Sequence, residues 1–234
     1  MNIRGLQKTS LLDFPGEICA TLFVGGCNLR CKYCHNRDLV LEDTALPYYP
    51  PREIIAFLQK RNALLDGVCI TGGEPTLRGV ETMLPFLAAV KNTGLKVKLD
   101  TNGTRPAVID KLLQEGVLDY IAVDIKGPWE KYPLITGVDM DPGTVKETVA
   151  LLKGYGLGQE FRTTVVPGLL TAVDLLGIAR EIAGCPKYVL QQYRPPVAFI
   201  DPAFSAGQPF SHEKIRQVAE TCREHIQMVE LRGF

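Results

Sequence analysis

The sequence predicts an α/β fold with a parallel sheet, in a single domain that spans residues 1–234. Short runs rich in Val, Ile, Leu and Thr alternate with segments of helical periodicity, and this alternation is typical of parallel sheets. Right-handed crossovers then allow a partial barrel, a full barrel or a doubly wound sheet. Polar clusters follow several of the expected strands, which places these clusters at the edge where such folds carry their active sites.

Six strands are expected from apolar, β-branched runs. The first, ICATLFVGG, covers residues 18–26, and GVCITGG covers residues 67–73. The other four are expected at 95–103, 119–127, 160–168 and 187–195, and 228–233 is a candidate for an additional, last strand.

Helical periodicity fills the intervals between the strands. PREIIAFLQKRNALL (51–65) places Ile54, Phe57 and Leu58 on one face, and Pro51 suits the first turn of a helix. The other helices are expected around 80–87 and at 106–115, 142–155, 171–183 and 211–224, with a proline-rich loop at 195–209.

Composition narrows the function classes. The chain has 26 Lys and Arg against 26 Asp and Glu, so its charge predicts neither a nucleic-acid partner nor a membrane partner. The first residues contain no apolar run that resembles a signal sequence, and no stretch approaches the ~20 apolar residues of a spanning helix. Seven cysteines, three of them clustered, do not resemble a secreted disulfide framework. We therefore expect a cytoplasmic protein whose thiols can bind metal.

The three clustered cysteines, Cys27, Cys31 and Cys34, have the spacing C-x₃-C-x₂-C within CNLRCKYCHN. Structural zinc sites take four protein ligands, and His35 is a poor fourth ligand because it directly follows Cys34. A 4Fe–4S cluster with three thiolates instead leaves one iron open to a molecule with an amine and a carboxylate. The other cysteines are expected to be buried apolar residues: Cys19, Cys69, Cys185 and Cys222.

With the aromatic Tyr33 before its last cysteine, this motif resembles the signature of the radical S-adenosylmethionine superfamily. The resemblance implies one 4Fe–4S cluster that binds S-adenosylmethionine and cleaves it reductively to a 5′-deoxyadenosyl radical, with Tyr33 near the adenine. TGGEP resembles the segment that binds the methionine ammonium, which implies that Gly72, Gly73 and Glu74 contact the cofactor. The family's fold is a partial (β/α)6 TIM-like barrel.

Within that superfamily, the chain most resembles activases of glycyl radical enzymes. The segments that carry this resemblance are DFPG (13–16), CHN (34–36), DTNG (100–103), DIKG (124–127) and FRTTVVPG (161–168). The segments KTSLLDFPG and LQQYRP are most similar to the corresponding segments of activating proteins of anaerobic ribonucleoside-triphosphate reductase. The implied reaction is hydrogen abstraction from a glycine of a partner protein, with flavodoxin or ferredoxin as the reductant.

The resemblance also implies roles for single residues. Asp124 and Lys126 would lie near S-adenosylmethionine, with Lys126 available to a carboxylate and Arg162 pointing into the same rim. Arg194 stands where pyruvate formate-lyase activases carry a histidine near the nucleoside, and His35 belongs to the matching CHN segment. The alternatives are a solvated strand end for Lys126 and a salt bridge to a neighbouring acid for Arg162. Residues 194–210 either face the partner or pack across the open edge of the barrel.

A monovalent cation is a further expectation. Asp100, Thr101 and Asp124 end adjacent strands, and two neighbouring carboxylates repel unless a positive group lies between them. Lys126 or a hard cation would supply that charge, and the resemblance adds the carbonyl of Ala122 as a ligand. The alternative is that Asp100 only caps the TNG turn.

Two other functions remain open from the sequence. One is a small-molecule radical enzyme such as a 7-carboxy-7-deazaguanine synthase, and the other is a non-enzymatic iron–sulfur carrier or zinc-binding module. The second alternative leaves TGGEP, DTNG and DIKG unexplained. The sequence does not tell which glycyl radical enzyme would be the partner.

Overall fold

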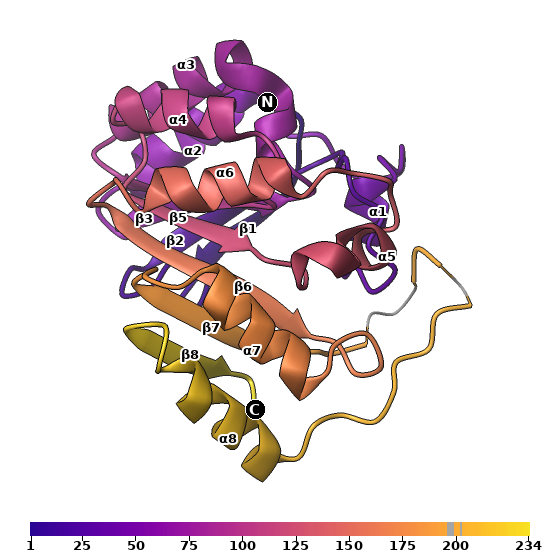
Figure 1. The fold of residues 1–234 in the computed structure, drawn as a ribbon. Coiled ribbons are helices and arrows are strands. Elements are labelled where there is room, and N and C mark those ends of the chain that lie inside the picture. Colours follow the sequence, from indigo (N-terminus) through magenta and orange to yellow (C-terminus); the bar gives the residue numbers. More distant parts are fainter. Residues whose placement is uncertain (196–198, 202) are drawn as a thin grey trace. The chain divides into compact units, whose positions relative to one another are not determined.

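The computed structural model describes residues 1–195, 199–201 and 203–234 (Figure 1). The backbone falls into two compact units. The first comprises residues 1–28, 38–101 and 105–122, and the second comprises residues 29–37, 102–104 and 123–234. Within the described ranges, no helix is both long enough and apolar enough to cross a membrane.

Strands of the first unit pair in chain order: β1 (Ile3–Ser10), β2 (Cys19–Val24), β3 (Gly67–Gly72) and β4 (Lys96–Thr101). The β2–β3 and β3–β4 pairs are parallel, as predicted, but β1 is antiparallel to β2. Strand β1 was not predicted. Its sequence, IRGLQKTS, has only its two end residues buried, so it lacks the apolar run of a central strand.

Helices of the first unit follow the predicted segments: α2 (Pro51–Arg61), α3 (Gly79–Lys91) and α4 (Pro106–Gln114), with the 3₁₀ turn η1 (Pro75–Arg78) before α3. The short helix α1 (Arg37–Val40) lies where the two units meet in the chain. Prolines occupy the first turns of α2 and α4, where a missing N–H removes no helical hydrogen bond.

Strands and helices of the second unit also alternate. Its strands are β6 (Gly158–Val165), β7 (Lys187–Gln192) and β8 (Met228–Arg232), paired in parallel and in chain order. Its helices are α5 (Tyr132–Thr136), α6 (Gly143–Leu152), α7 (Ala172–Glu181) and α8 (His212–Cys222), with the turn η2 (Trp129–Lys131). Strand β5 (Tyr120–Asp124) contributes residues to both units. Parallel strands connected by helices confirm the predicted α/β class.

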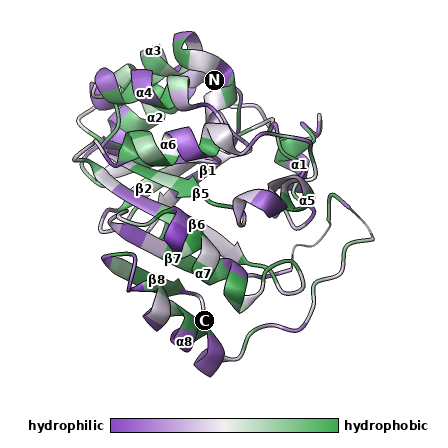
Figure 2. Cartoon of the chain, viewed as in Figure 1, coloured by the Kyte–Doolittle hydropathy of each residue, from purple (hydrophilic) through white to green (hydrophobic). Residues whose placement is uncertain are grey.

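Burial explains which residues form these elements. Figure 2 shows both hydrophilic and hydrophobic residues along α8, and its apolar residues Ile215, Val218, Ala219 and Cys222 are the buried ones. In the first unit, Phe14 packs against Cys19, Cys69 and the ring of Tyr120. Cys19, Cys69, Cys185 and Cys222 are all buried, as predicted.

The DFPG segment is held by its own side chains. Thr21 donates to Oδ2 of Asp13 at 2.6 Å, and a Cβ on Gly67 would come within 2.9 Å of the Phe14 ring. Phe14 therefore occupies space that a larger residue at position 67 would need.

Candidate active site

The end of β3 lies directly against the backbone that leads into Cys27. The N–H of Gly73 donates to the carbonyl of Val24, and the N–H of Glu74 donates to the carbonyl of Gly26, both at 2.8 Å. A Cβ on Gly73 would overlap that Gly26 carbonyl, and Gly72 has φ +114° with Val24 backbone atoms close by. Both glycines of TGGEP are thus required by close backbone approach.

We predict that Gly73→Ala disrupts this strand end. Because the added methyl group overlaps backbone and not a flexible side chain, the substitution should destabilise the protein by about 1–3 kcal/mol and weaken S-adenosylmethionine binding. Thermal unfolding and calorimetric binding would measure the two effects. Gly177→Ala is the matched control: it lies within α7 with no atom within 4 Å of the new Cβ, and should stabilise by about 0.5–1 kcal/mol. Unchanged binding and stability in the Gly73 variant would contradict the prediction.

Glu74 is fully buried and connects two strand ends. Its Oε1 accepts hydrogen bonds from the backbone N–H of Thr76 at 3.0 Å, from the Thr76 hydroxyl at 2.6 Å and from the Thr101 hydroxyl at 2.8 Å. The carboxylate therefore joins the end of β3 to the end of β4. Contact between Glu74 and a bound ammonium remains a prediction, and the structure adds this structural role.

Asp100 is paired within its own strand. The ammonium of Lys98 forms an ion pair with its Oδ1, and Lys98 is only 1% exposed. Residues i and i+2 of a strand lie on the same face, so this pair follows from the sequence KLD once both faces of β4 are covered. The sequence analysis did not identify Lys98, because the alternation in KVKLD is typical of a strand with one solvated face.

Asp124 lies between two cations in the second unit. Nε of Arg162 donates to Oδ1 at 2.8 Å, and Nζ of Lys126 donates to Oδ2 at 3.0 Å. Burial alone would raise the pKa of the Asp124 carboxyl, but the charges of Arg162 and Lys126 outweigh it and hold the pKa well below its usual range. Burial lowers the pKa of Lys126, yet Asp124 more than compensates and raises it. The three residues therefore stay charged, and Arg162 has the acidic partner that the sequence analysis considered.

Two of the clustered cysteines lie in an ordered turn of the second unit. The N–H of Cys34 donates to the carbonyl of Cys31 at 3.1 Å, and the N–H of Arg30 donates to the carbonyl of Thr136 in α5 at 2.8 Å. Burial is the main reason that the pKa of the Cys34 thiol is raised, and the nearby charge of Lys126 opposes this shift.

Tyr193, just after β7, contacts both aromatic residues that flank Cys34. Its ring centroid lies 6.5 Å from that of Tyr33 and 6.2 Å from that of His35, both in edge-on geometry. Tyr33 is buried, and this burial raises the pKa of its hydroxyl. Arg194 is exposed, and its carbonyl accepts a hydrogen bond from His35. The segment LQQYRP contains this tyrosine, but its contacts with Tyr33 and His35 were not predicted.

The predicted ligands are divided between the two units. Cys27, Asp100, Thr101 and Ala122 belong to the first unit, whereas Cys31, Cys34 and Asp124 belong to the second. In the part of the chain that the structure describes, no three His, Cys, Asp or Glu side chains form a ready-made metal site. None of the seven cysteines, all of which lie in the described ranges, forms a disulfide. The cluster ligands and the cation ligands therefore remain predictions from the motifs.

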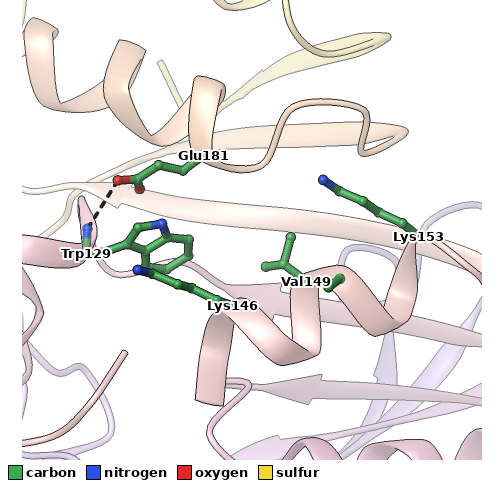
Figure 3. Close-up of a pocket in the computed structure, with 6 residues that line it drawn as sticks. Trp129, Lys146, Val149, Lys153 and Glu181 are labelled. Carbon is green, nitrogen blue, oxygen red and sulfur yellow. Dashed lines mark hydrogen bonds between the residues drawn. The ribbon is translucent and has the colours of Figure 1, made fainter. Parts of the chain in front are cut away.

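A separate pocket of about 310 Å³ lies in the second unit, lined by Trp129, Lys146, Val149, Ala150, Lys153 and Glu181. Figure 3 shows Lys146, Val149 and Lys153 along α6, with Glu181 reaching toward Trp129 from the end of α7. The backbone N–H of Trp129 donates to Oε1 of Glu181 at 3.5 Å, and the Lys146 ammonium lies 5.7 Å from the centre of the Trp129 indole ring. None of these residues was predicted to be functional.

Glu181 gives a prediction about pH. Burial, together with the charge of Glu130, raises the pKa of Glu181 from 4.5 to about 7, despite the opposing effects of Trp129 and Lys146. The unfolded chain ionises this group near 4.5, so its contribution to stability falls as the pH rises from about 4.5 to about 7. Glu181→Gln should therefore gain stability relative to the natural chain between pH 5 and pH 8. Denaturant unfolding, followed by the fluorescence of the single tryptophan, Trp129, measures the difference.

The control for this prediction is Glu147→Gln, which alters an exposed glutamate on α6. Its stability difference from the natural chain should be the same at both pH values. A Glu181 variant that behaved like this control would show that the pocket does not penalise the ionised carboxylate.

Comparison with known families decides the class of this site. The sequence matches the model of the radical SAM superfamily over residues 21–174, which include all three clustered cysteines, TGGEP and DIKG. The chain belongs to the radical S-adenosylmethionine superfamily. Membership in this superfamily implies a 4Fe–4S cluster and S-adenosylmethionine as cofactors.

Relatives with names place this radical S-adenosylmethionine protein among the activating enzymes of glycyl radical enzymes. It is 31% identical to the "Putative glycyl-radical enzyme activating enzyme MJ1227" of Methanocaldococcus jannaschii, over 98% of this chain and 95% of that protein. It is 33% identical to pyruvate formate-lyase 1-activating enzyme of Escherichia coli K12, over 53% of this chain and 51% of that enzyme. The chain thus spans about half the length of the E. coli relative.

Solved structures support the fold of this radical S-adenosylmethionine enzyme. SuiB of Streptococcus suis superposes with a TM-score of 0.69 at 14% identity, over 91% of this chain and 48% of SuiB. A domain of pyruvate-formate lyase-activating enzyme from Bacteroides vulgatus superposes with a TM-score of 0.57 at 16% identity, over 71% of this chain and 99% of that domain. At such identities the likeness concerns the fold alone, and it confirms the predicted partial barrel.

Proposed function

We propose that the chain cleaves S-adenosylmethionine reductively and abstracts a hydrogen atom from one glycine of a glycyl radical enzyme, with anaerobic ribonucleoside-triphosphate reductase as that partner. The observation that carries the activase part is the 31% identity to a named activating enzyme over 98% of this chain. The choice of partner rests on the segments KTSLLDFPG and LQQYRP. The bound cluster and S-adenosylmethionine would supply the electron and the 5′-deoxyadenosyl radical.

The donor set fits the cluster. Cys27, Cys31 and Cys34 are not in disulfides, and the hydrogen-bonded turn keeps the backbones of Cys31 and Cys34 close. Burial raises the pKa of the Cys34 thiol, and the positive charge of Lys126 opposes this shift and so helps the thiolate that iron requires. We propose these three cysteines as the cluster ligands, with a cytoplasmic flavodoxin or ferredoxin as the electron donor.

For S-adenosylmethionine, we propose contacts with both sets of polar groups. Gly72, Gly73 and Glu74 would bind the methionine ammonium, because glycine leaves the backbone of this strand end open to close approach. Lys126, held in place by Asp124, would bind the methionine carboxylate. The remaining predicted contacts are with the nucleoside or near it: Tyr33, His35, Arg162 and Arg194.

Positioning is the main contribution that we assign to the protein. The radical must form beside the target glycine, away from water and from other hydrogens, and fixed ionic contacts help to hold S-adenosylmethionine in one orientation. Residues 194–210 are proposed to face the partner, although residues 196–198 and 202 of this loop lie outside the described residues.

Ion pairs within the protein weaken the electrostatic argument for the predicted monovalent cation. Asp100 is paired with Lys98, and Asp124 with Lys126 and Arg162, so each carboxylate has a cationic partner within the protein. Thr101 donates its hydroxyl proton to Glu74. The repulsion that called for a metal cation is therefore already relieved.

The proposed function is tested by reconstituting the protein anaerobically with iron and sulfide and adding a reductant and S-adenosylmethionine. With anaerobic ribonucleotide reductase, electron paramagnetic resonance should show a glycine-centred doublet, and 5′-deoxyadenosine should accumulate. Parallel mixtures contain pyruvate formate-lyase or no partner. A doublet with another partner would overturn the choice of reductase and keep the activase. Rapid turnover with a deazapurine precursor alone, and no doublet with any partner, would overturn the activase.

A further inference from the structure

Lys98 is a charged residue at a buried position that the proposed chemistry has not used. Lysine is rarely buried unless it is paired, yet Lys98 is 1% exposed in the middle of β4. The register pairs it with Cys69 of β3, and its Nζ lies 3.8 Å from the sulfur of that residue. The ring of Tyr120 lies 5.9 Å from the ammonium.

The ion pair with Asp100 is the one strong interaction among these contacts. A thiol is a weak hydrogen-bond acceptor and an aromatic face compensates little charge, so the carboxylate of Asp100 is the group that balances the buried ammonium. The pair also fixes Asp100 at the end of β4, next to Thr101, whose hydroxyl is bonded to Glu74. The strand end thus contains a carboxylate with a covalently attached counter-cation.

We infer that Lys98 is a positioning residue that replaces a bound monovalent cation at Asp100. This inference rests on the proposed function, because the site would serve S-adenosylmethionine. An ammonium carries the same single charge as sodium or potassium, but it is delivered by the fold and does not depend on the solution. The first-unit part of the site is therefore independent of the salt in the buffer.

The first test needs no S-adenosylmethionine and no cluster. Sodium-23 magnetic resonance of the apo-protein should show no saturable broadening with the natural chain. Lys98→Met removes the charge at similar length and with it the ion pair to Asp100, so this variant should bind sodium and broaden the signal. Lys98→Met combined with Asp100→Asn should abolish the broadening again. Saturable sodium binding by the natural chain that Asp100→Asn removes would overturn the inference, whatever the protein's reaction.

The second test measures S-adenosylmethionine binding to the reconstituted protein by calorimetry, in potassium and in tetramethylammonium buffers. The natural chain should bind equally in both. Lys98→Met should bind about tenfold more weakly in tetramethylammonium than in potassium. The matched control is Lys91→Met, which removes another lysine paired to a carboxylate, Asp119, and should show no ion dependence.

The results of the two tests distinguish a failure of the proposed function from a failure of the inference about Lys98. No binding by the natural chain in either buffer would overturn the proposed function, and the sodium measurement would still decide the role of Lys98. The inference would be overturned if binding by the natural chain depended on potassium. It would also be overturned if the Lys98→Met variant bound S-adenosylmethionine as tightly as the natural chain in both buffers. If Lys98→Met fails to fold, sodium binding can still be compared between the natural chain and the double variant. The double variant removes both charges of the ion pair.

Discussion

Replacing Cys27, Cys31 or Cys34 by alanine should abolish S-adenosylmethionine cleavage. A cluster held by two thiolates loses the ligand set that keeps one iron open and the others bound, so iron content and the cluster's visible absorption should fall together. The apo-proteins should still fold, because both units bury extended apolar cores in which Cys31 is the one proposed cluster ligand among the buried residues described. This behaviour contrasts with a zinc finger, whose folding requires its metal.

The controls for this series are Cys19→Ala and Cys222→Ala. Both residues are buried thiols outside the clustered motif, and burial raises the pKa of Cys222 to about 11. These variants should retain full iron and cleavage with a modest loss of stability. A Cys31 variant with normal iron and normal 5′-deoxyadenosine formation would end the assignment of the cluster.

Asp124→Ala should cause the second large loss, in both binding and stability. Removing the carboxylate takes away the counter-charge that Lys126 and Arg162 share, and Arg162 keeps only its more distant ion pair with Glu160 among the pairs described, at 4.0 Å. Breaking a fully buried pair costs about 3–5 kcal/mol, and the partial exposure of Asp124 places this case at or below the lower end. S-adenosylmethionine affinity should fall by about tenfold or more, because Lys126 loses the contact that orients it.

Two variants distinguish these effects. Asp124→Asn keeps the shape and removes the charge, so it should recover part of the stability and little of the affinity. Asp119→Ala also removes a carboxylate, one that accepts hydrogen bonds from the Lys91 ammonium and from the backbone N–H of Val97. It should lower the thermal stability and leave affinity unchanged. If Asp119→Ala weakened binding as much as Asp124→Ala, the loss would be one of general stability.

The sequence predicted the polar strand ends better than it predicted their partners. Asp124, Lys126 and Arg162 were placed at one rim through the resemblance of DIKG and FRTTVVPG to the activases. A salt bridge was foreseen only for Arg162, as an alternative, and the ionic group of all three residues was not predicted, since pairing depends on side-chain directions. Lys98 was missed because helices and neighbouring strands, not β4 itself, determine that both faces of the strand are covered.

Boundaries and edge elements were the other weak point. Strand β1 has a polar sequence and pairs antiparallel, so neither apolar content nor strand–helix alternation indicated it. The short helices α1 and α5 fall in segments without a full period of apolar residues, and they were not predicted. Short elements of this kind depend on tertiary contacts, such as the hydrogen bond from Arg30 to the carbonyl of Thr136.

The position of Tyr193 has a consequence for conformational entropy. Its ring contacts Tyr33 and His35, on either side of Cys34, so part of the thiol-bearing loop is already ordered by aromatic packing when the chain folds. Fixing a residue costs about 1–2 kcal/mol of backbone entropy, and a loop that is ordered beforehand has less of this cost left to meet when it binds its ligand. Part of the loop that carries Cys34 is therefore ordered before any ligand binds, and the residue responsible, Tyr193, belongs to a segment far away in the sequence.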